Sequence, residues 1–175
     1  THEDYIPLRL TTTILGGGFS SRLMQNLRED KGYTYGAGVG FGANAAGGSL
    51  IASSDVRNEV TGKAVSEFFA EYKRIGEEPV SAAELDMNKR YVADGYLISN
   101  QLQGAVAGTL ASNWLIGLPP ESLGEFVPKV REVSAEQVQA MGAKYFKPEA
   151  QSIVVVGDEA VVEQLKDFGK FEDVK

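Results

Sequence analysis

The chain has 175 residues, of which 43% are hydrophobic and 23% charged, the usage of an ordinary globular domain with one hydrophobic core. Acidic residues outnumber basic ones by 24 to 17, and the basic residues are scattered, so nucleic acid and anionic membranes are poor candidates for partners. The lack of cysteine excludes disulfides, a thiolate nucleophile and zinc–thiolate sites. No apolar run reaches the roughly 20 residues that a membrane span requires, so we expect no such span.

The N-terminal segment THEDYIPLRL contains neither an initiator methionine nor the basic and apolar parts of a targeting signal. We therefore expect residues 1–175 to be a single domain and a processed or excised piece. His2 is the only histidine, so a metal site that needs two histidines is excluded. Its neighbours Glu3 and Asp4 are conceivable ligands, but a terminal segment offers no fixed geometry, and we expect no metal site in this chain.

The first part of the chain predicts two helices with a glycine link between them. Apolar residues in 5–15 run up to three consecutive glycines, 16–18, which is a common way to end a helix. A second helix follows, capped by Ser20 or Ser21 and ending at Gly32, because the apolar residues after the cap repeat at helical spacing. The three glycines are therefore predicted to form a tight link.

Residues 33–56 predict an antiparallel hairpin. Alternate positions from Tyr33 to Phe41, Tyr35 among them, are aromatic or apolar, whereas the positions between them are Thr34 and four glycines in 36–42. This is strand periodicity with one glycine face, which indicates close approach by another layer. A turn at 45–48 and a returning strand, SLIASSDV, complete the hairpin.

The remainder of the chain is predicted to be mainly helical. Two capping boxes, Ser81 with Glu84 and Ser134 with Gln137, mark helix starts. The predicted helices cover residues 58–76, 81–102, 105–116, 121–131, 134–147 and 159–168. Pro128 is predicted to break the helix at 121–131. In the helix at 159–168, Val161, Val162 and Leu165 are predicted to face inward. SIVVVGD, residues 152–158, is predicted to be a buried strand. This order of elements predicts an α+β fold.

The glycines of GVGFGA, residues 38–43, formally match the G-x-G-x-x-A fingerprint of dinucleotide-binding proteins. That motif must follow a strand and open a helix, so that phosphate meets the free N–H groups of the helix. Here the glycines lie inside a predicted strand, and the next predicted helix begins at residue 58. The glycines at 16–18 do precede a helix but lack the lysine of a phosphate-binding loop. We therefore reject nucleotide binding.

Arg28 and Tyr35 are candidate functional residues, because a helix end and a strand start would place a guanidinium and a phenol near one chain reversal. Both groups donate hydrogen bonds. The residues alone favour structural roles, in which Arg28 complements the negative end of its helix and Tyr35 packs with its aromatic neighbours. Glu84 and Asp86 are predicted to be exposed carboxylates that only increase solubility.

The run LGGGFSSRLMQNLREDKGYTYGAGVGF closely resembles the hallmark segment of the pitrilysin/insulinase-type family of zinc metallopeptidases, in the family's second, non-zinc domain. The family pattern is a glycine-rich turn, S-R-L at a helix start and L-R-E-x-x-G-x-x-Y leading into a strand, which Leu27, Arg28, Glu29, Gly32 and Tyr35 match. VSAAELDMNK and VSAEQVQAMGAKYFKPEAQSIVVVGD resemble further family segments. The resemblance covers nearly the whole chain except its first few residues. The family domain normally begins with a strand upstream of the first helix, so the resemblance implies that the domain 1–175 is truncated at its N-terminus.

The resemblance implies an antiparallel or mixed sheet packed on one side by helices. It also implies a two-domain bacterial peptidase, in which the first domain binds zinc through an inverted H-x-x-E-H motif and the second closes over it. The family's arginine and tyrosine, which map onto Arg28 and Tyr35, hold the substrate backbone and stabilise the oxyanion. The expected partners are a zinc-binding peptidase domain, on the same chain or a separate subunit, and a peptide substrate.

The chain departs from a complete peptidase because it has one histidine and no H-x-x-E-H motif. We therefore expect the substrate-binding domain of a zinc-dependent metalloendopeptidase, with zinc and general base supplied elsewhere, no catalytic residue of its own and no activity alone. The alternative is a non-catalytic peptide-binding or assembly module, like the core subunits of processing peptidases. Family analogy slightly favours the bacterial periplasm over the cytoplasm.

Overall fold

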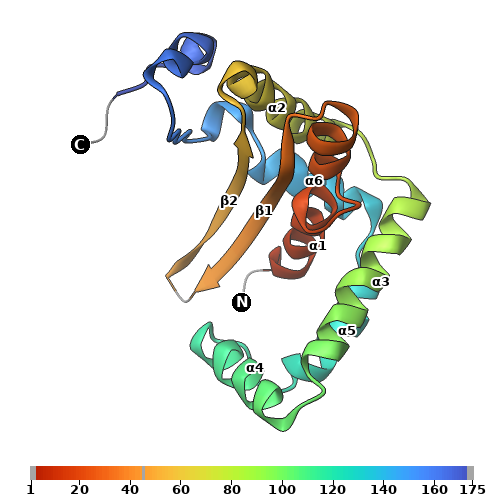
Figure 1. Ribbon diagram of the computed structural model, residues 1–175. Helices are drawn as coiled ribbons and strands as arrows, with labels where there is room; N and C mark the ends of the chain where they lie inside the picture. The colour runs from red at the N-terminus through yellow and green to blue at the C-terminus, as the bar shows by residue number, and fades with distance from the viewer. Residues whose placement is uncertain (1–2, 45, 173–175) are drawn as a thin grey trace.

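The computed structural model describes residues 3–44 and 46–172, and these residues form the α+β fold that the sequence predicts (Figure 1). In chain order the elements are α1 (Tyr5–Gly16), the π-helix η1 (Met24–Asp30), β1 (Thr34–Asn44), β2 (Gly47–Val56), the 3₁₀-helix η2 (Asn58–Val60), α2 (Thr61–Glu77), α3 (Ala82–Ser99), α4 (Gln103–Leu115), α5 (Ser122–Glu132), α6 (Ala135–Tyr145) and the 3₁₀-helices η3 (Pro148–Ala150) and η4 (Glu159–Phe168).

β1 and β2 form an antiparallel hairpin, which is the whole of the sheet among the described residues. Val39 lies opposite Ala52, and Asn44 lies opposite Gly47 beside the turn. α1 packs against β1, and the β1 residues Ala37 and Val39 are buried there. The predicted hairpin is confirmed, and its register places every second residue of β1 against the helices.

The hydrophobic core lies between α1, η1, α2, α6 and the inner side of β1. Leu10 of α1, Leu27 of η1, Ile75 of α2 and Val138 of α6 are fully buried in it. These four helical segments approach one another from distant parts of the sequence. Burying each such side chain stabilises the fold by about 1.5–3 kcal/mol relative to leaving it in water.

The C-terminal end of α1 touches the middle of β1 at a pair of glycines. A Cβ atom on Gly16 would lie 2.4 Å from the backbone nitrogen of Val39, and one on Gly38 would lie 3.2 Å from the carbonyl oxygen of Gly16. At Gly36 nothing lies within 4 Å of such an atom. The predicted close approach to the glycine face is therefore correct for Gly38 and wrong for Gly36.

α2 and α6 also pack closely, and an aromatic cluster lies beside their contact. A Cβ atom on Gly142 would lie 2.6 Å from the carbonyl oxygen of Ile75, so the helix backbones nearly touch. The ring of Tyr72 lies 6.0 Å from that of Phe69 and 5.3 Å from that of Phe146, between ring centroids. Burial raises the pKa of Tyr72 to about 12.

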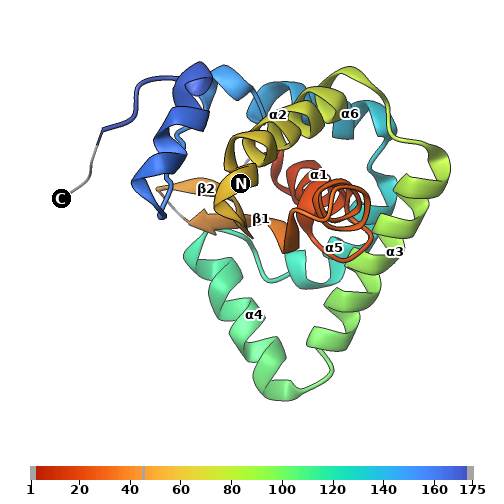
Figure 2. The ribbon, with the colours of Figure 1, turned by 45° about the horizontal axis from the view of Figure 1, so that its top comes forward.

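α3 and α5 lie side by side and extend away from the sheet, and α4 joins their far ends (Figures 1 and 2). The cap of α3 is confirmed, because the Ser81 hydroxyl accepts from the N–H of Glu84, and α6 has the complete predicted capping box of Ser134 and Gln137. α4 contains no buried residue. A hydrogen bond from the Thr109 hydroxyl to the side-chain oxygen of Asn100, at 2.7 Å, joins it to the end of α3.

The prediction of a buried strand at residues 152–158 is wrong. Among the described residues, no backbone hydrogen bond joins 152–157 to another segment, and Val154 and Val156 are 84% and 98% exposed. A strand is stable only when a neighbouring strand satisfies its backbone groups. Here β1 and β2 pair with each other, and no third strand is described beside 152–157.

Smaller differences concern helix type. The predicted helix after the glycines is π-helical in η1, and α5 continues through Pro128 instead of breaking there. The last helix is a 3₁₀-helix, in which Val161 and Leu165 are buried as predicted but Val162 is 42% exposed.

The contact between α1 and β1 predicts a strong effect for Gly16→Ala. The added methyl group would force the helix end away from the strand, and overpacking of this kind typically costs about 1–3 kcal/mol. We expect the free energy of unfolding, measured by urea denaturation, to fall by that amount. Gly124→Ala in α5, where nothing lies within 4 Å of the new atom, is the matched control and should not destabilise. Equal effects of both substitutions would contradict the proposed contact.

The raised pKa of Tyr72 predicts a loss of stability in alkali. In the unfolded chain this phenol ionises near its ordinary pKa of 10.0, whereas in the folded protein it stays neutral up to about 12. Its contribution is therefore present below pH 10 and is lost as the pH rises through 12, by about 3 kcal/mol at most. Urea denaturation from about pH 9 to about pH 11.5 should show a shallower decline for Tyr72→Phe than for the unchanged protein. Parallel declines would show that Tyr72 is not the titrating group.

Candidate functional site

The segment that carries the candidate residues leaves the core on an irregular helix. Residues Met24–Asp30 form the π-helix η1, and the N–H of Lys31 donates to the carbonyl oxygen of Asn26, five residues earlier, at 3.0 Å. Short π-helical turns are rare and occur frequently at functional sites. Gly32 then has a φ of 61°, which favours glycine, and turns the chain into β1.

A β-bulge at the start of β1 sets the direction of Tyr35. Thr34 lies opposite Val56 and Ala37 opposite Ser54, so β1 has one more residue than β2 between these pairs. The hydroxyls of Thr34 and Ser54 hydrogen-bond backbone groups inside the bulge. The extra residue interrupts the alternation of sides, and Tyr35 is 95% exposed.

The exposure of Tyr35 contradicts the predicted packing with its aromatic neighbours. Phe41 instead packs on Tyr5, with 5.7 Å between ring centroids, and Tyr33 lies against the core. In the part of the chain that the structure describes, Tyr35 makes neither a side-chain hydrogen bond nor a ring contact. Its hydroxyl is therefore available to a ligand.

Arg28 lies in the last turn of η1, where a cation complements the negative end of the helix as predicted. Its guanidinium carbon lies 5.1 Å from the ring centre of Phe19, which is itself 75% exposed. Its Nε lies 3.5 Å from a carboxylate oxygen of Glu29, and both side chains reach solvent. An exposed pair of this kind contributes less than about 1 kcal/mol, so the guanidinium can change partners easily.

Arg28 and Tyr35 lie at the two ends of one chain reversal, as the sequence predicts. The reversal is fixed by a hydrogen bond from the N–H of Tyr33 to the carbonyl oxygen of Leu27, at 2.8 Å. Within the described residues, no hydrogen bond or ring contact joins the two candidate side chains directly. The structure thus fixes the backbone that carries both donors, while the donors themselves face outward.

An ion pair that the sequence did not reveal anchors this segment. Arg22, just before η1, donates from Nε and Nη2 to the two carboxylate oxygens of Glu84, at 2.8 and 2.9 Å. Burial opposes the charge of Arg22, but the pair with Glu84 outweighs it and the pKa of Arg22 is raised. The prediction that Glu84 only increases solubility is wrong, whereas Asp86 is exposed as predicted. Sequence spacing alone could not connect residues 62 positions apart.

The described residues contain no group of three or more His, Cys, Asp or Glu side chains that could hold a metal ion. His2 lies outside the described residues. Asp4 accepts hydrogen bonds from Lys144 Nζ at 2.5 Å and from the Tyr145 hydroxyl at 2.7 Å, so it is fixed in the fold. The residues present do not fit a zinc ion. No helix in the described part of the chain is long and apolar enough to cross a membrane.

Comparisons with known proteins agree with the hallmark segment. A family model described as "Peptidase M16 inactive domain" matches residues 1–92, which include η1 and β1. An "Uncharacterized zinc protease YmxG" of Bacillus subtilis (strain 168) is 26% identical over 148 residues, 83% of this chain and 36% of that protein.

Two solved structures have the same fold. A peptidase M16 inactive domain from Pseudomonas fluorescens is 30% identical, with a TM-score of 0.75 over 82% of this chain and 34% of that one. A putative zinc protease from Bordetella pertussis Tohama I is 21% identical, with a TM-score of 0.70 over 82% of this chain and 79% of that one.

The chain spans about a third of the length of the Bacillus and Pseudomonas relatives. The family model nevertheless covers more than half of the chain, since it matches residues 1–92 of 175. The chain belongs to the peptidase M16 family of zinc proteases, the pitrilysin/insulinase-type family that its sequence resembles, and corresponds to the family's inactive domain.

Proposed function

We propose that this domain holds the peptide substrate of a zinc-dependent metalloendopeptidase, with Arg28 and Tyr35 as hydrogen-bond donors to the substrate backbone and to the oxyanion. Zinc and the general base come from another peptidase domain. The chain alone does not hydrolyse peptides, because its described residues do not fit a metal and it has no H-x-x-E-H motif.

The observation that supports this proposal most is the β-bulge before Ala37. A regular strand would have placed Tyr35 on the buried side with Ala37 and Val39. The bulge directs it into solvent, where it is 95% exposed and has no partner among the described residues. A large aromatic side chain gains nothing for stability in that position. Bulges that redirect a side chain are frequent next to active sites.

The two donors have complementary chemistry. The guanidinium of Arg28 is always charged and presents several N–H groups in a plane, which suits a carbonyl that gains negative charge. The phenol of Tyr35 supplies one neutral donor. Phe19 lies near the guanidinium, with 5.1 Å between its ring centre and Cζ, and adds a cation–π contact. A preorganised donor to a developing oxyanion is worth about 3–4 kcal/mol, or a factor of 10²–10³ in kcat.

The backbone around the site has the rigidity that this role requires. The pair of Arg22 with Glu84 ties the start of the segment to α3, and the contact of Gly16 with Val39 ties its other side to α1. Both donors therefore project from a fixed frame. Rigid support matters because an oxyanion donor that is displaced by about 1 Å loses much of its effect.

The alternative function is a non-catalytic peptide-binding or assembly module of the same fold. The exposed apolar residues of α4, Trp114 and Leu115, favour a protein partner at that helix, since they are 76% and 66% exposed. The coding sequence of the partner domain distinguishes the two functions. An H-x-x-E-H motif there supports the peptidase, and its absence supports the module.

The proposed role predicts that Arg28→Ala and Tyr35→Phe each lower kcat of peptide hydrolysis about 100- to 1000-fold in the complete protease, with a smaller change in KM. The loss follows because each donor is used most when the carbonyl carries its negative charge. Initial rates with a fluorogenic peptide measure the effect.

Matched controls are Arg90→Ala and Tyr33→Phe, which remove an exposed arginine on α3 and a neighbouring phenol. Both controls should retain full activity. The controls and the test variants should all have the same unfolding midpoint as the unchanged protein. Unchanged kcat/KM in both Arg28→Ala and Tyr35→Phe would refute the assignment.

A further inference from the structure

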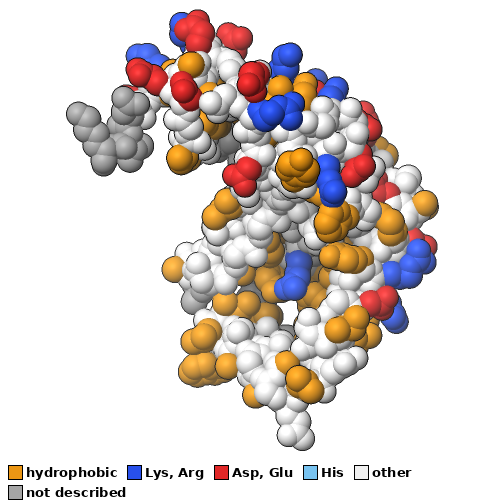
Figure 3. Space-filling view, in the orientation of Figure 1, with side chains coloured by type: hydrophobic (Ala, Val, Ile, Leu, Met, Phe, Trp, Pro, Cys, Tyr) orange, Lys and Arg blue, Asp and Glu red, His pale blue; other side chains and the backbone are white. Residues whose placement is uncertain are grey.

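A cavity of about 1040 Å³ lies between α4 and the rest of the domain (Figure 3). Its walls come from α1, β1, α3, α4 and α5, which are far apart in the sequence. Its volume is at the upper end of the range for pockets that bind small molecules, about 300–1000 Å³. The space is open to solvent, so a ligand could enter it.

The side of α4 that faces the cavity keeps it open. The α4 residues that line it are small or polar: Ala105, Gly108, Thr109, Ser112 and Asn113. The large apolar residues of the helix, Trp114 and Leu115, are exposed and do not line the cavity. A helix that packs on a core has the opposite arrangement. α4 therefore forms a polar wall and does not fill the space.

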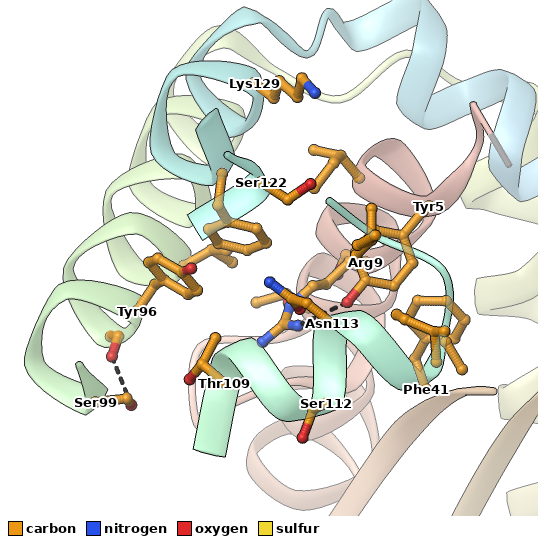
Figure 4. A pocket seen from close by; sticks show the side chains of 18 of the residues that line it. Tyr5, Arg9, Phe41, Tyr96, Ser99, Thr109, Ser112, Asn113, Ser122 and Lys129 are labelled. Atoms are coloured by element: carbon orange, nitrogen blue, oxygen red, sulfur yellow. Dashed lines mark hydrogen bonds between the residues drawn. The ribbon is translucent and has the colours of Figure 1, made fainter. Parts of the chain in front are cut away.

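Arg9 of α1 places a cation inside this cavity, where Asn113 of α4 points toward it (Figure 4). Its Nη1 donates to the Tyr5 hydroxyl at 3.4 Å, which is a long hydrogen bond. No carboxylate among the described residues forms an ion pair with Arg9. The other charged residues that line the cavity are Glu3 and Lys129, and Lys129 is paired with Glu125 at 2.6 Å.

Aromatic rings surround the guanidinium of Arg9. Its Cζ lies 5.0 Å from the ring centre of Phe126, and Phe126 stacks on Tyr96 with 4.1 Å between ring centroids. On the other side, Tyr5 packs on Phe41 at 5.7 Å. Arg9 itself is exposed, so a ligand in the cavity can reach its guanidinium, and the rings beside it limit the positions that it takes. The cavity thus combines a cation that forms no ion pair among the described residues with aromatic rings on two sides.

We propose that this cavity binds the C-terminal residue of a peptide, with the carboxylate on Arg9 and an aromatic or large apolar side chain between the rings. Asn113 has both a donor and an acceptor, which match the last peptide group of such a ligand. A guanidinium binds a carboxylate through two parallel hydrogen bonds, which makes the contact selective for this group.

This proposal rests on the proposed function, because it assumes that peptides reach this domain. It concerns a second site, however. Phe41 at the cavity lies six residues beyond Tyr35 on β1, a distance of about 20 Å in an extended strand. A ligand at Arg9 is therefore separate from the group held by Arg28 and Tyr35.

The test compares two forms of one peptide with the complete protein. Isothermal titration calorimetry is run with N-acetyl-Ala-Ala-Phe-Phe as the free acid and as the C-terminal amide, and mass spectrometry verifies that each remains intact. The free acid should bind at least about tenfold more tightly, since a hydrogen-bonded charge is lost in the amide. Arg9→Gln should remove this preference, and Arg9→Lys should keep part of it. Arg90→Gln, the same change on the exposed side of α3, should keep all of it.

Three results would overturn the proposal: equal affinity for acid and amide, a preference that survives in Arg9→Gln, or no binding of either peptide. A third ligand, 3-phenylpropanoate, separates peptide ends from small organic acids. If it binds as tightly as the tetrapeptide acid, the site is one for small acids and the assignment to peptides is wrong. Arg28→Ala should leave the ratio of the acid affinity to the amide affinity unchanged. This ratio therefore tests the cavity at Arg9 independently of the role proposed for Arg28.

Discussion

The contact between the end of α1 and the middle of β1 determines how the rest of the domain is arranged. A Cβ atom on Gly16 would lie 2.4 Å from the nitrogen of Val39, so the helix and the strand meet backbone to backbone. The contact fixes which residues of β1 face the core, because the side-chain period of a strand is two. Ala37 and Val39 are therefore buried, and the residues before them must either follow that alternation or break it.

The chain breaks the alternation at the point where it gains a donor at the surface. The bulge between Thr34 and Ala37 and the π-helical turn before Lys31 are both irregular, and both lie within a few residues of Gly32. Each irregularity replaces regular hydrogen bonds with less favourable ones, which costs stability. Packing does not explain why a π-helical turn and a β-bulge, each of which lowers stability, lie next to each other. They agree with a segment whose side chains are positioned for binding.

Much of the fold follows from patterns within the sequence. The helical stripe predicted for residues 58–76, the cap at Ser81 and the box of Ser134 and Gln137 all depend on neighbours a few residues apart. The structure confirms the caps, and it confirms the stripe as α2 (Thr61–Glu77). The strand predicted at 152–158 fails because strands depend on a distant partner, which the described residues do not supply. For the same reason, patterns within the sequence did not reveal the ion pair of Arg22 with Glu84, which lie 62 residues apart.

For the candidate site, the sequence indicated Arg28 and Tyr35 through their resemblance to a family motif, and the structure adds why Tyr35 is exposed. Alternation alone placed it among buried neighbours, since one inserted residue leaves no mark in the pattern. The sequence did not indicate Arg9 as a candidate residue for a similar reason. It occupies an ordinary helical position, and only the placement of α4 across from it creates the cavity.

The distribution of charge connects the two proposed sites. The protein has a net charge of -7, so much of its surface should repel the carboxylates of a peptide. Several cations are neutralised by acids, as Arg22 is by Glu84 and Lys144 by Asp4. Arg9 has no such acid among the described residues, and Arg28 has only its exposed neighbour Glu29 at 3.5 Å. On this acidic domain, the two proposed sites each use an arginine that no buried acid neutralises among the described residues, so both arginines remain free to meet the negative groups that we propose as their ligands.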